Sequence, residues 1–404
     1  MKFKSISIGS WKQFESINIT FHPSVTILTG ANGSGKTTVL GVLSRHFGWN
    51  RLELFTPTKN DDTGIFSWIP KIFWRKSEHL IKIGEIQYDK GSSELQIPRQ
   101  DGPQYHLQIP NPQHLKGINI PSHRPVYFYQ QVPHISTRKR TKDEAYNLVM
   151  QSSLQRYNNG HSQSSNYYIK ETLLSWAISG SGNEFITPDQ EMREYFLGFE
   201  LVLKKVLPES LGFKKVAVRS YEIILETESG DFMLDAVSGG VSALIDLSWQ
   251  IYNCERSEDG GLVVLIDEIE NHLHPSMQRR ILPDLVAAFP NTQFIVSTHS
   301  PLVVGSVKES SVYAFSYNES NRVVSQELDM VNKAKTASHI LNSVLGVPVT
   351  MPIWAESELD KILSKYRNIQ NPEAQFASLR DELFQAGLSD YFPDALLKLS
   401  KDWK

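Results

Sequence analysis

A glycine-rich stretch near the start of the chain carries the clearest chemistry. The apolar run Val25–Thr29 is typical of a buried strand, and the residues after it have the spacing G-x-x-x-x-G-K-T. Glycines in such a loop let backbone N–H groups approach phosphate oxygens where a Cβ would clash. The pattern predicts a nucleoside triphosphate site, in which Lys36 reaches the β- and γ-phosphates and the Thr37 hydroxyl ligates Mg²⁺. The residues expected to hold the nucleotide are Gly30, Asn32, Gly33, Ser34, Gly35, Lys36, Thr37 and Thr38.

Two acidic residues follow a second apolar run. Residues 262–266 read Leu-Val-Val-Leu-Ile, and Asp267 and Glu268 come directly after them. A buried parallel strand would deliver Asp267 to the carboxyl edge of the sheet, beside the phosphate loop, where it can hold Mg²⁺. Glu268 would then face the γ-phosphate and could activate a water molecule as a general base.

Two further motifs are candidates for contact with phosphate. Ser238, Gly239 and Gly240 open a predicted helix, and exposed amides at a helix start can bind an anion. His299 follows the apolar strand predicted at 293–297, so we expect it at the same sheet edge as Asp267 and list it with Lys36 and Glu268 as a catalytic candidate.

The elements that must position these residues indicate an α/β fold. Continuous apolar strands alternate with helices, which favours a parallel sheet covered on both faces. Residues 3–8 and 16–21 alternate as an antiparallel strand pair, and residues 125–131 read as a buried strand that ends in Gln130 and Gln131. Residues 141–206 are helical in pattern, and the chain is again helical in pieces after residue 332.

Four parts follow from this reading. Residues 1–140 form an N-terminal lobe with the phosphate loop and a β-rich part, and 141–210 a helical insertion. Residues 211–325 form a second lobe with the serine-glycine loop, Asp267 and His299, and 326–404 a helical C-terminal subdomain.

Composition narrows the class of protein. The 404 residues carry a net charge of −3 and a single cysteine, Cys254, which excludes a disulfide framework and a cysteine-based metal site. Without a long apolar run or a secretory signal, we expect a soluble, cytoplasmic protein with no membrane partner. Nucleic acid binding would need a local basic patch, for which residues 138–142 are the candidate and an ordinary solvated charge run the alternative.

The order of these motifs resembles an ABC-type ATPase head of the branch that includes SMC proteins, RecF and the OLD-family ATPases of phage-defence systems. The turn Glu270 to Pro275 (E-N-H-L-H-P) and the ending S-T-H-S-P at 297–301 are particularly like the OLD-type and related defence ATPases. The resemblance covers residues 1–48 and 210–315 well, and it implies a P-loop fold with a parallel core sheet, an N-terminal antiparallel β lobe, a helical insertion and a helical C-terminal region.

The resemblance also implies a homodimer closed over two ATP molecules. The phosphate loop of one subunit would face Ser238, Gly239 and Gly240 of the other, and Lys12 in the opening strand-turn would lie near the nucleotide. In the family, a glutamine that binds the metal follows the last strand before the helical insertion. Both Gln130 and Gln131 are candidates for this residue. The serine-glycine loop departs from the family's L-S-G-G-Q, since Val237 and Val241 flank it.

What such a head controls is less defined by the sequence. It encodes no long coiled coil, and residues 316–404 lack the D-x-D of a Toprim nuclease, so a built-in nuclease is disfavoured. Glu270, His272 and His274 suit the inter-subunit turn better than a metal cluster. The preferred hypothesis is a nucleotide-gated switch that acts on a separate effector, a nuclease or toxin, in phage defence. The alternative is a RecF-like or SMC-like DNA-binding ATPase of repair or recombination.

Overall fold

A computed structural model describes ten ranges of the chain. They are residues 1–55, 58–59, 66–67, 80–99, 102–136, 138–159, 164–255, 261–329, 352–366 and 376–402. The chain divides into two compact units, one of residues 1–340 and 344–346 and one of residues 341–343 and 347–404.

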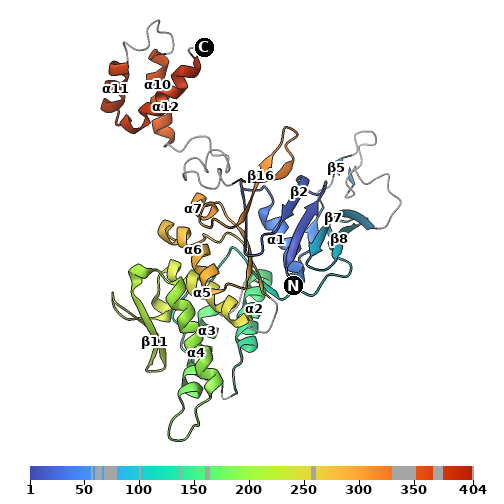
Figure 1. The fold of residues 1–404 in the computed structure, drawn as a ribbon, viewed down its shortest axis with the longest axis vertical. Helices are drawn as coiled ribbons and strands as arrows, with labels where there is room; N and C mark the ends of the chain where they lie inside the picture. The colour runs from blue at the N-terminus through green and yellow to red at the C-terminus, as the bar shows by residue number, and fades with distance from the viewer. Residues whose placement is uncertain are drawn as a thin grey trace. The chain divides into compact units, whose positions relative to one another are not determined.

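The first unit is built on a ten-stranded sheet with the order β10-β14-β15-β3-β16-β17-β2-β1-β7-β8 (Figure 1). Its strands in chain order are β1 (Phe3–Ile8), β2 (Phe14–Thr20), β3 (Val25–Gly30), β7 (Leu80–Tyr88), β8 (Ser92–Pro98), β10 (Gly117–Ile120), β14 (Val263–Ile266), β15 (Gln293–Ser297), β16 (Ser311–Tyr317) and β17 (Val323–Glu327).

Five neighbouring strands, β10, β14, β15, β3 and β16, are parallel. Every residue of β3, β14 and β15 is buried, which is why their sequences are continuous apolar runs. Their carboxyl ends lie at one edge, so the residues that follow Gly30, Ile266 and Ser297 are brought together there.

The other half of the sheet is mostly antiparallel: β17 runs antiparallel to β16 but parallel to β2, and the pairs from β2 to β8 are antiparallel. β1 pairs with β2 through Ile6↔Ile19 and Ile8↔Ile17, which confirms the antiparallel pair predicted from the alternation of residues 3–8 and 16–21. β7 and β8 extend it on the other side of β1. Strands β7 and β8, from the β-rich part predicted within residues 1–140, therefore form one end of the sheet that carries the phosphate loop.

Helices cover both faces of the parallel part. Side chains alternate along β14, with Val264 in one hydrophobic cluster with α5 and Val263 in the other with α1. The helices of this unit are α1 (Lys36–Ser44), α2 (Lys142–Asn159), α3 (Ser165–Ser181), α4 (Gln190–Val206), α5 (Gly239–Cys254), α6 (Pro275–Ala288) and α7 (Pro301–Val304).

The predicted helical insertion is present as α2, α3 and α4. Figure 1 shows α3 and α4 side by side, and Asp189 caps α4 by accepting hydrogen bonds from the backbone N–H groups of residues 191 and 192. A small sheet follows them, made of β11 (Phe213–Arg219), β12 (Glu222–Thr227) and β13 (Phe232–Met233). The other short elements are β4 (Glu53–Leu54), β5 (Thr58–Lys59), β6 (Phe66–Ser67), β9 (Gln104–Tyr105) and the 3₁₀ turns at Arg45–Phe47, Glu209–Leu211, Leu234–Ala236 and Ser389–Tyr391.

The strand predicted at residues 125–131 is wrong. The strand that precedes the helical insertion is β10, and residues 121–136 contain no helix or strand. The backbone carbonyls of this segment are bound by side chains of α3 and its N-cap instead of by a neighbouring strand. Ser164, Asn166 and Lys170 donate to the carbonyl oxygens of residues 126, 128 and 130 at 3.4, 2.8 and 2.7 Å.

The second unit is helical, as the sequence pattern predicts. Its helices are α10 (Ile353–Tyr366), α11 (Phe376–Gln385) and α12 (Phe392–Asp402). Leu359, Leu363, Leu383 and Leu399 lie in its own buried apolar cluster. In the described parts of both units, no helix combines the length and hydropathy that crossing a bilayer requires.

Candidate functional site

The loop from Gly30 to Gly35 is closely packed against its neighbours. Gly30 has φ +137°, and a Cβ on it would lie 2.4 Å from the Phe315 carbonyl oxygen. Gly35 has φ +94°, and a Cβ there would lie 2.3 Å from the Phe14 ring. Both positions therefore require glycine for conformation and for space. The loop ends at the first residue of α1, so the helix start faces the loop.

The side chain of Lys36 folds over this loop. Its ammonium donates to the carbonyl oxygens of Gly30 and Ala31 at 3.0 and 3.1 Å. Burial lowers the pKa of Lys36 to about 8, against the opposing charges of Asp267 and two nearby glutamates. The buried hydroxyl of Ser34 has no hydrogen-bond partner among the described residues. A phosphate group suits this arrangement, because it would accept from both side chains and from the loop amides.

Asp267 lies directly beside α1, as the sequence predicts. The Thr37 hydroxyl donates to its two carboxylate oxygens at 3.1 and 3.0 Å, and the Ser297 hydroxyl donates to Oδ1 at 2.5 Å. A hydroxyl and a carboxylate next to a phosphate loop are oxygen ligands of the kind that Mg²⁺ takes together with substrate phosphates. The described residues hold no group of three or more His, Cys, Asp or Glu arranged for a metal, so Glu270, His272 and His274 form no such cluster.

Glu268 has an unusual backbone conformation. Its φ is +46°, which is uncommon for a residue with a long side chain and is found at strained, functional positions. Its N–H donates to the Ser297 hydroxyl at 2.8 Å, and its carboxylate accepts from the Asn271 side-chain amide at 2.8 Å. The carboxylate is therefore held at the end of β14, one residue beyond Asp267.

His299 reaches the same edge from β15. Its backbone N–H donates to the Glu270 carboxylate at 2.5 Å, which ties the end of β15 to the turn after β14. The other carboxylate oxygen of Glu270 is buried and has no hydrogen-bond partner among the described residues. Burial, together with the charge of Lys36, lowers the pKa of His299, so its imidazole is neutral at neutral pH. The sequence had offered Glu270 only as part of a histidine-rich turn.

The glutamines expected at the metal lie in a different environment. The Gln130 carbonyl accepts from Lys170 at 2.7 Å, its side-chain oxygen is buried, and Gln131 is exposed. A hollow of about 380 Å³ beside Thr37 and Asp267 is lined by other residues of the segment after β10. These are Pro121, Ser122 and His123, which the sequence did not indicate because the strand end was predicted at residue 131 and lies at Ile120.

The side chain of Lys12 contacts groups outside the loop. Its ammonium forms an ion pair with Glu53 and lies 5.0 Å from the centre of the Trp11 ring. The neighbouring Gln13 contacts the loop instead, through a 3.5 Å hydrogen bond from its amide to the Gly33 carbonyl oxygen.

Ser238, Gly239 and Gly240 begin α5, as predicted. Ser238 is the N-cap, but its hydroxyl makes no capping hydrogen bond, and both Ser238 and Gly239 are exposed. A Cβ on Gly239 would meet nothing within 4 Å. The first amides of α5 are therefore presented to solvent.

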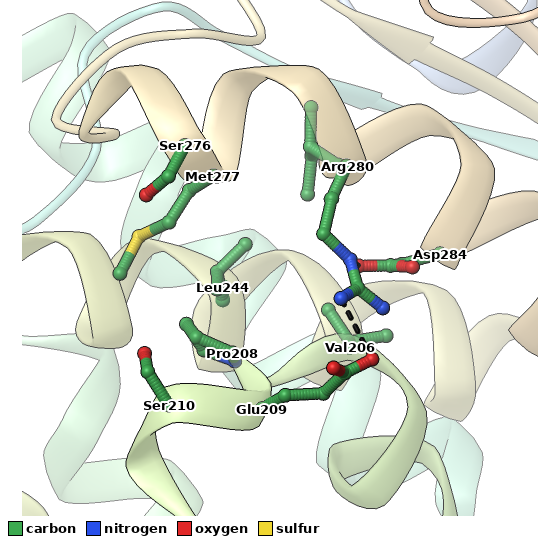
Figure 2. Close-up of a pocket in the computed structure, with 10 residues that line it drawn as sticks. Val206, Pro208, Glu209, Ser210, Leu244, Ser276, Met277, Arg280 and Asp284 are labelled. Carbon is green, nitrogen blue, oxygen red and sulfur yellow. Dashed lines mark hydrogen bonds and ion pairs between the residues drawn. The ribbon is translucent and has the colours of Figure 1, made fainter.

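A second hollow, of about 250 Å³, is lined by residues of α4, α5, α6 and the turn after α4 (Figure 2). Its apolar walls are formed by Leu244, Val206, Pro208 and Met277. Arg280 pairs with Glu209 at 2.7 Å, and Figure 2 shows this pair at the hollow. None of the candidate residues for phosphate or metal lines it. It is a feature separate from the phosphate loop.

The basic run at 138–142 is largely compensated within the chain. Lys139 pairs with Asp189 and Glu191 at 3.1 and 2.5 Å. Arg140 pairs with Glu171 at 3.0 Å, and Lys142 lies 3.7 Å from the centre of the Tyr252 ring. These contacts leave less charge for nucleic acid than the sequence of the run suggests.

Comparison with known proteins places this geometry in a family. A family model described as "AAA domain, putative AbiEii toxin, Type IV TA system" matches residues 25–305. The chain belongs to this family. The match spans the phosphate loop, the helical insertion, the serine-glycine loop, Asp267 and His299. The resemblance to ABC-type ATPase heads of defence systems, drawn from the motifs, is confirmed by this match and by the relatives that follow.

Two curated relatives differ in how much they share with the chain. The "Retron Ec83 probable ATPase" of Escherichia coli is 28% identical over 57% of this chain and 40% of its own length. "Septu protein PtuA" of Bacillus thuringiensis is 22% identical over 90% of this chain and 89% of its own length. The chain thus spans less than half of the retron protein and most of PtuA.

Among solved structures, the "SMC head domain from Thermotoga maritima" aligns with 81% of this chain and 100% of its own, at 14% identity and a TM-score of 0.43. The class predicted from the sequence is confirmed by the elements of this chain itself, which are a parallel core sheet, an antiparallel N-terminal part, a helical insertion and a helical C-terminal region.

Proposed function

We propose that the chain binds and hydrolyses ATP, closes into a dimer when ATP is bound, and uses this cycle to control a separate effector protein in phage defence. One observation carries the proposal: Lys36, the Thr37–Asp267 pair and Glu268 converge at one edge of the sheet, from elements up to 230 residues apart in sequence.

In the proposed complex, the amides of residues 33–38 and the ammonium of Lys36 bind the β- and γ-phosphates. Lys36 exchanges its two carbonyl partners for phosphate oxygens, and Ser34 gains an acceptor for its hydroxyl. Thr37 and Asp267 hold Mg²⁺, which when bound neutralises charge on the phosphate oxygens.

Hydrolysis is assigned to the carboxylate of Glu268. It accepts a proton from a water molecule as the water oxygen attacks the γ-phosphorus, and the bond from the γ-phosphorus to the bridging oxygen breaks to release ADP and phosphate. The neutral imidazole of His299 donates a hydrogen bond to the γ-phosphate, and Glu270 fixes the backbone that carries this ring.

The exposed start of α5 supports the dimer. The phosphate loop already supplies one helix N-terminus to the nucleotide, so Ser238, Gly239 and Gly240 would meet the γ-phosphate bound by a second subunit. Open space around Gly239 and the uncapped Ser238 hydroxyl suit such a contact.

Control of an effector is the part of the proposal that rests on relatives. The family model's description includes a toxin, and the relatives bear the names of retron and Septu components. We assign the effector activity, a nuclease or toxin, to another protein.

The substitution Glu268→Gln tests the enzymatic part. We expect unchanged ATP affinity, because Glu268 does not contact the bound phosphates, and a loss of turnover of at least about 100-fold, because the general base is removed. Steady-state ATPase assays and nucleotide-binding titrations measure the two quantities. Unchanged turnover would show that Glu268 is not the base.

A further inference from the structure

Arg124, which belongs to none of the motifs, contacts the turn that carries Glu268, the candidate general base. Arg124 follows β10 in the chain and is only 7% exposed. Its guanidinium donates to three backbone carbonyls of the turn after β14: to Glu268 at 3.1 Å, to Ile269 at 3.3 Å and to Asn271 at 2.8 Å. Burial lowers the pKa of Arg124 to about 10, so the group stays charged at neutral pH.

A cation buried against carbonyl groups is costly unless its donors are used in a fixed geometry. Here the planar fork reaches the oxygens of residues 268, 269 and 271 from two nitrogens, Nη1 and Nη2, whereas the donors of an ammonium all start from one nitrogen. Since Glu268 has a left-handed φ of +46°, its backbone would relax without such support.

Asn271 holds the side chain of the same glutamate. Its amide nitrogen donates to the Glu268 carboxylate at 2.8 Å and to the Ser122 carbonyl at 3.1 Å. Its own backbone N–H donates to the Glu268 carbonyl at 3.0 Å. The segment Ser122–Arg124 therefore contacts the turn after β14 in two ways. The Arg124 guanidinium donates to backbone carbonyls of the turn, and the Ser122 carbonyl accepts from the Asn271 side chain.

We infer that Arg124 and Asn271 are positioning residues for hydrolysis: Arg124 fixes the backbone of Glu268, and Asn271 fixes the direction of its carboxylate. The inference rests on the proposed function. Glu268 alone removes the proton from water, and the two positioning residues contact neither water nor phosphate. The donors hold the carboxylate in one orientation before the nucleotide binds, so less freedom remains to be lost in the reaction.

The variants Asn271→Ala and Asn271→Asp test the inference in the full chain with ATP and Mg²⁺. Ala removes both donors, and Asp keeps the shape but cannot donate to a carboxylate. We expect each to lower kcat about tenfold or more while KM for ATP changes less than about twofold, because the loss falls on the reaction step. Arg124→Lys, which keeps the charge but not the fork, should lie between these variants and the wild type.

A matched control is Asn183→Ala. Asn183 also stabilises a turn with two hydrogen bonds, accepting from the N–H groups of Phe185 and Ile186 at 2.8 and 3.0 Å, but it lies between α3 and α4. Its loss should leave kcat unchanged. Thermal unfolding of every variant shows whether a lower rate reflects a damaged fold.

A double-mutant comparison separates positioning from a general structural role. If Asn271 acts through Glu268, then Asn271→Ala should not reduce the residual single-turnover rate of Glu268→Gln any further. An equal loss in both backgrounds, or wild-type kcat in both Asn271 variants, contradicts the inference while leaving the proposed function intact. A wild type that hydrolyses no ATP, or that equals Glu268→Gln, contradicts the proposed function and the inference together.

Discussion

Two glycine-containing helix starts in this molecule differ sharply in their surroundings. In the loop that leads from β3 into α1, Gly30 and Gly35 have positive φ and no room for a Cβ, and Lys36 is buried. At the start of α5, Gly239 is exposed and has open space around it. The first is assembled completely within one chain, and the second is presented outward. This difference supports a site that two subunits complete together.

The largest predicted difference is in the free energy of unfolding, when a glycine at each helix start is replaced by alanine. Gly35→Ala forces a Cβ against Phe14 at a positive φ, and we expect it to lower the free energy of unfolding by about 3 kcal/mol or more. Gly239→Ala should change it by less than about 0.5 kcal/mol. Urea unfolding of both variants measures the contrast. Equal losses would mean that the two helix starts do not differ as described.

The next effect concerns the nucleotide. Lys36→Ala should weaken ATP binding by about 100-fold, because the buried ammonium that faces the phosphates is lost. The exposed Lys308 offers a control, since Lys308→Ala should leave the Kd unchanged. Fluorescent ATP titration gives both values. Wild-type affinity in Lys36→Ala would place the triphosphate elsewhere.

A smaller effect on binding is expected at α5. Ser238→Arg should leave the ATP affinity of one chain within about twofold, because Ser238 does not contact the nucleotide of its own subunit, yet it should reduce turnover about tenfold or more by blocking closure. Light scattering with and without ATP reports the dimer. A loss of ATP affinity equal to that of Lys36→Ala would argue for a site within one chain.

The smallest effect should be that of metal removal on the fold. Chelation by EDTA should abolish turnover, because Mg²⁺ is needed to neutralise the phosphate charge. It should shift the Tm of the nucleotide-free chain by less than about 2 °C, since hydroxyls of Thr37 and Ser297 already hold Asp267. A large shift in Tm would reveal a structural metal instead.

Features formed by residues close together in the sequence could be predicted, whereas features formed by distant residues could not. The phosphate loop, Asp267 and Glu268 each follow an apolar strand directly, so strand and loop could be read together, and the structure places them side by side. The strand prediction for residues 125–131 was wrong because a run of apolar and aromatic residues occurs both in strands and in irregular segments. Here the backbone carbonyls are bound by side chains instead of by a neighbouring strand. These side chains lie 38 to 40 residues further along the chain.

The same limit explains the missed residues. Arg124 belongs to no motif, and Asn271 lies in the turn Glu270 to Pro275, where the motif predicts no role for it. Both residues make contacts to residues 144 to 149 positions away in the sequence, which local spacing does not show. The position of Ser122 and His123 beside Thr37 and Asp267 follows from the end of β10 at Ile120. The sequence pattern had placed the strand before the helical insertion at residues 125–131. Local spacing indicated the candidate phosphate, metal and base residues. The residues that contact them from distant parts of the chain depend on tertiary packing.

The shared site is tested most directly by mixing two inactive variants. Lys36→Ala keeps an intact α5 start, and Ser238→Arg keeps an intact phosphate loop, so a mixed dimer contains one complete site. We predict that an equimolar mixture regains turnover, up to about a quarter of the wild type from random pairing, although each variant alone has little. A mixture as inactive as its parents would contradict the account that two subunits build each ATP site.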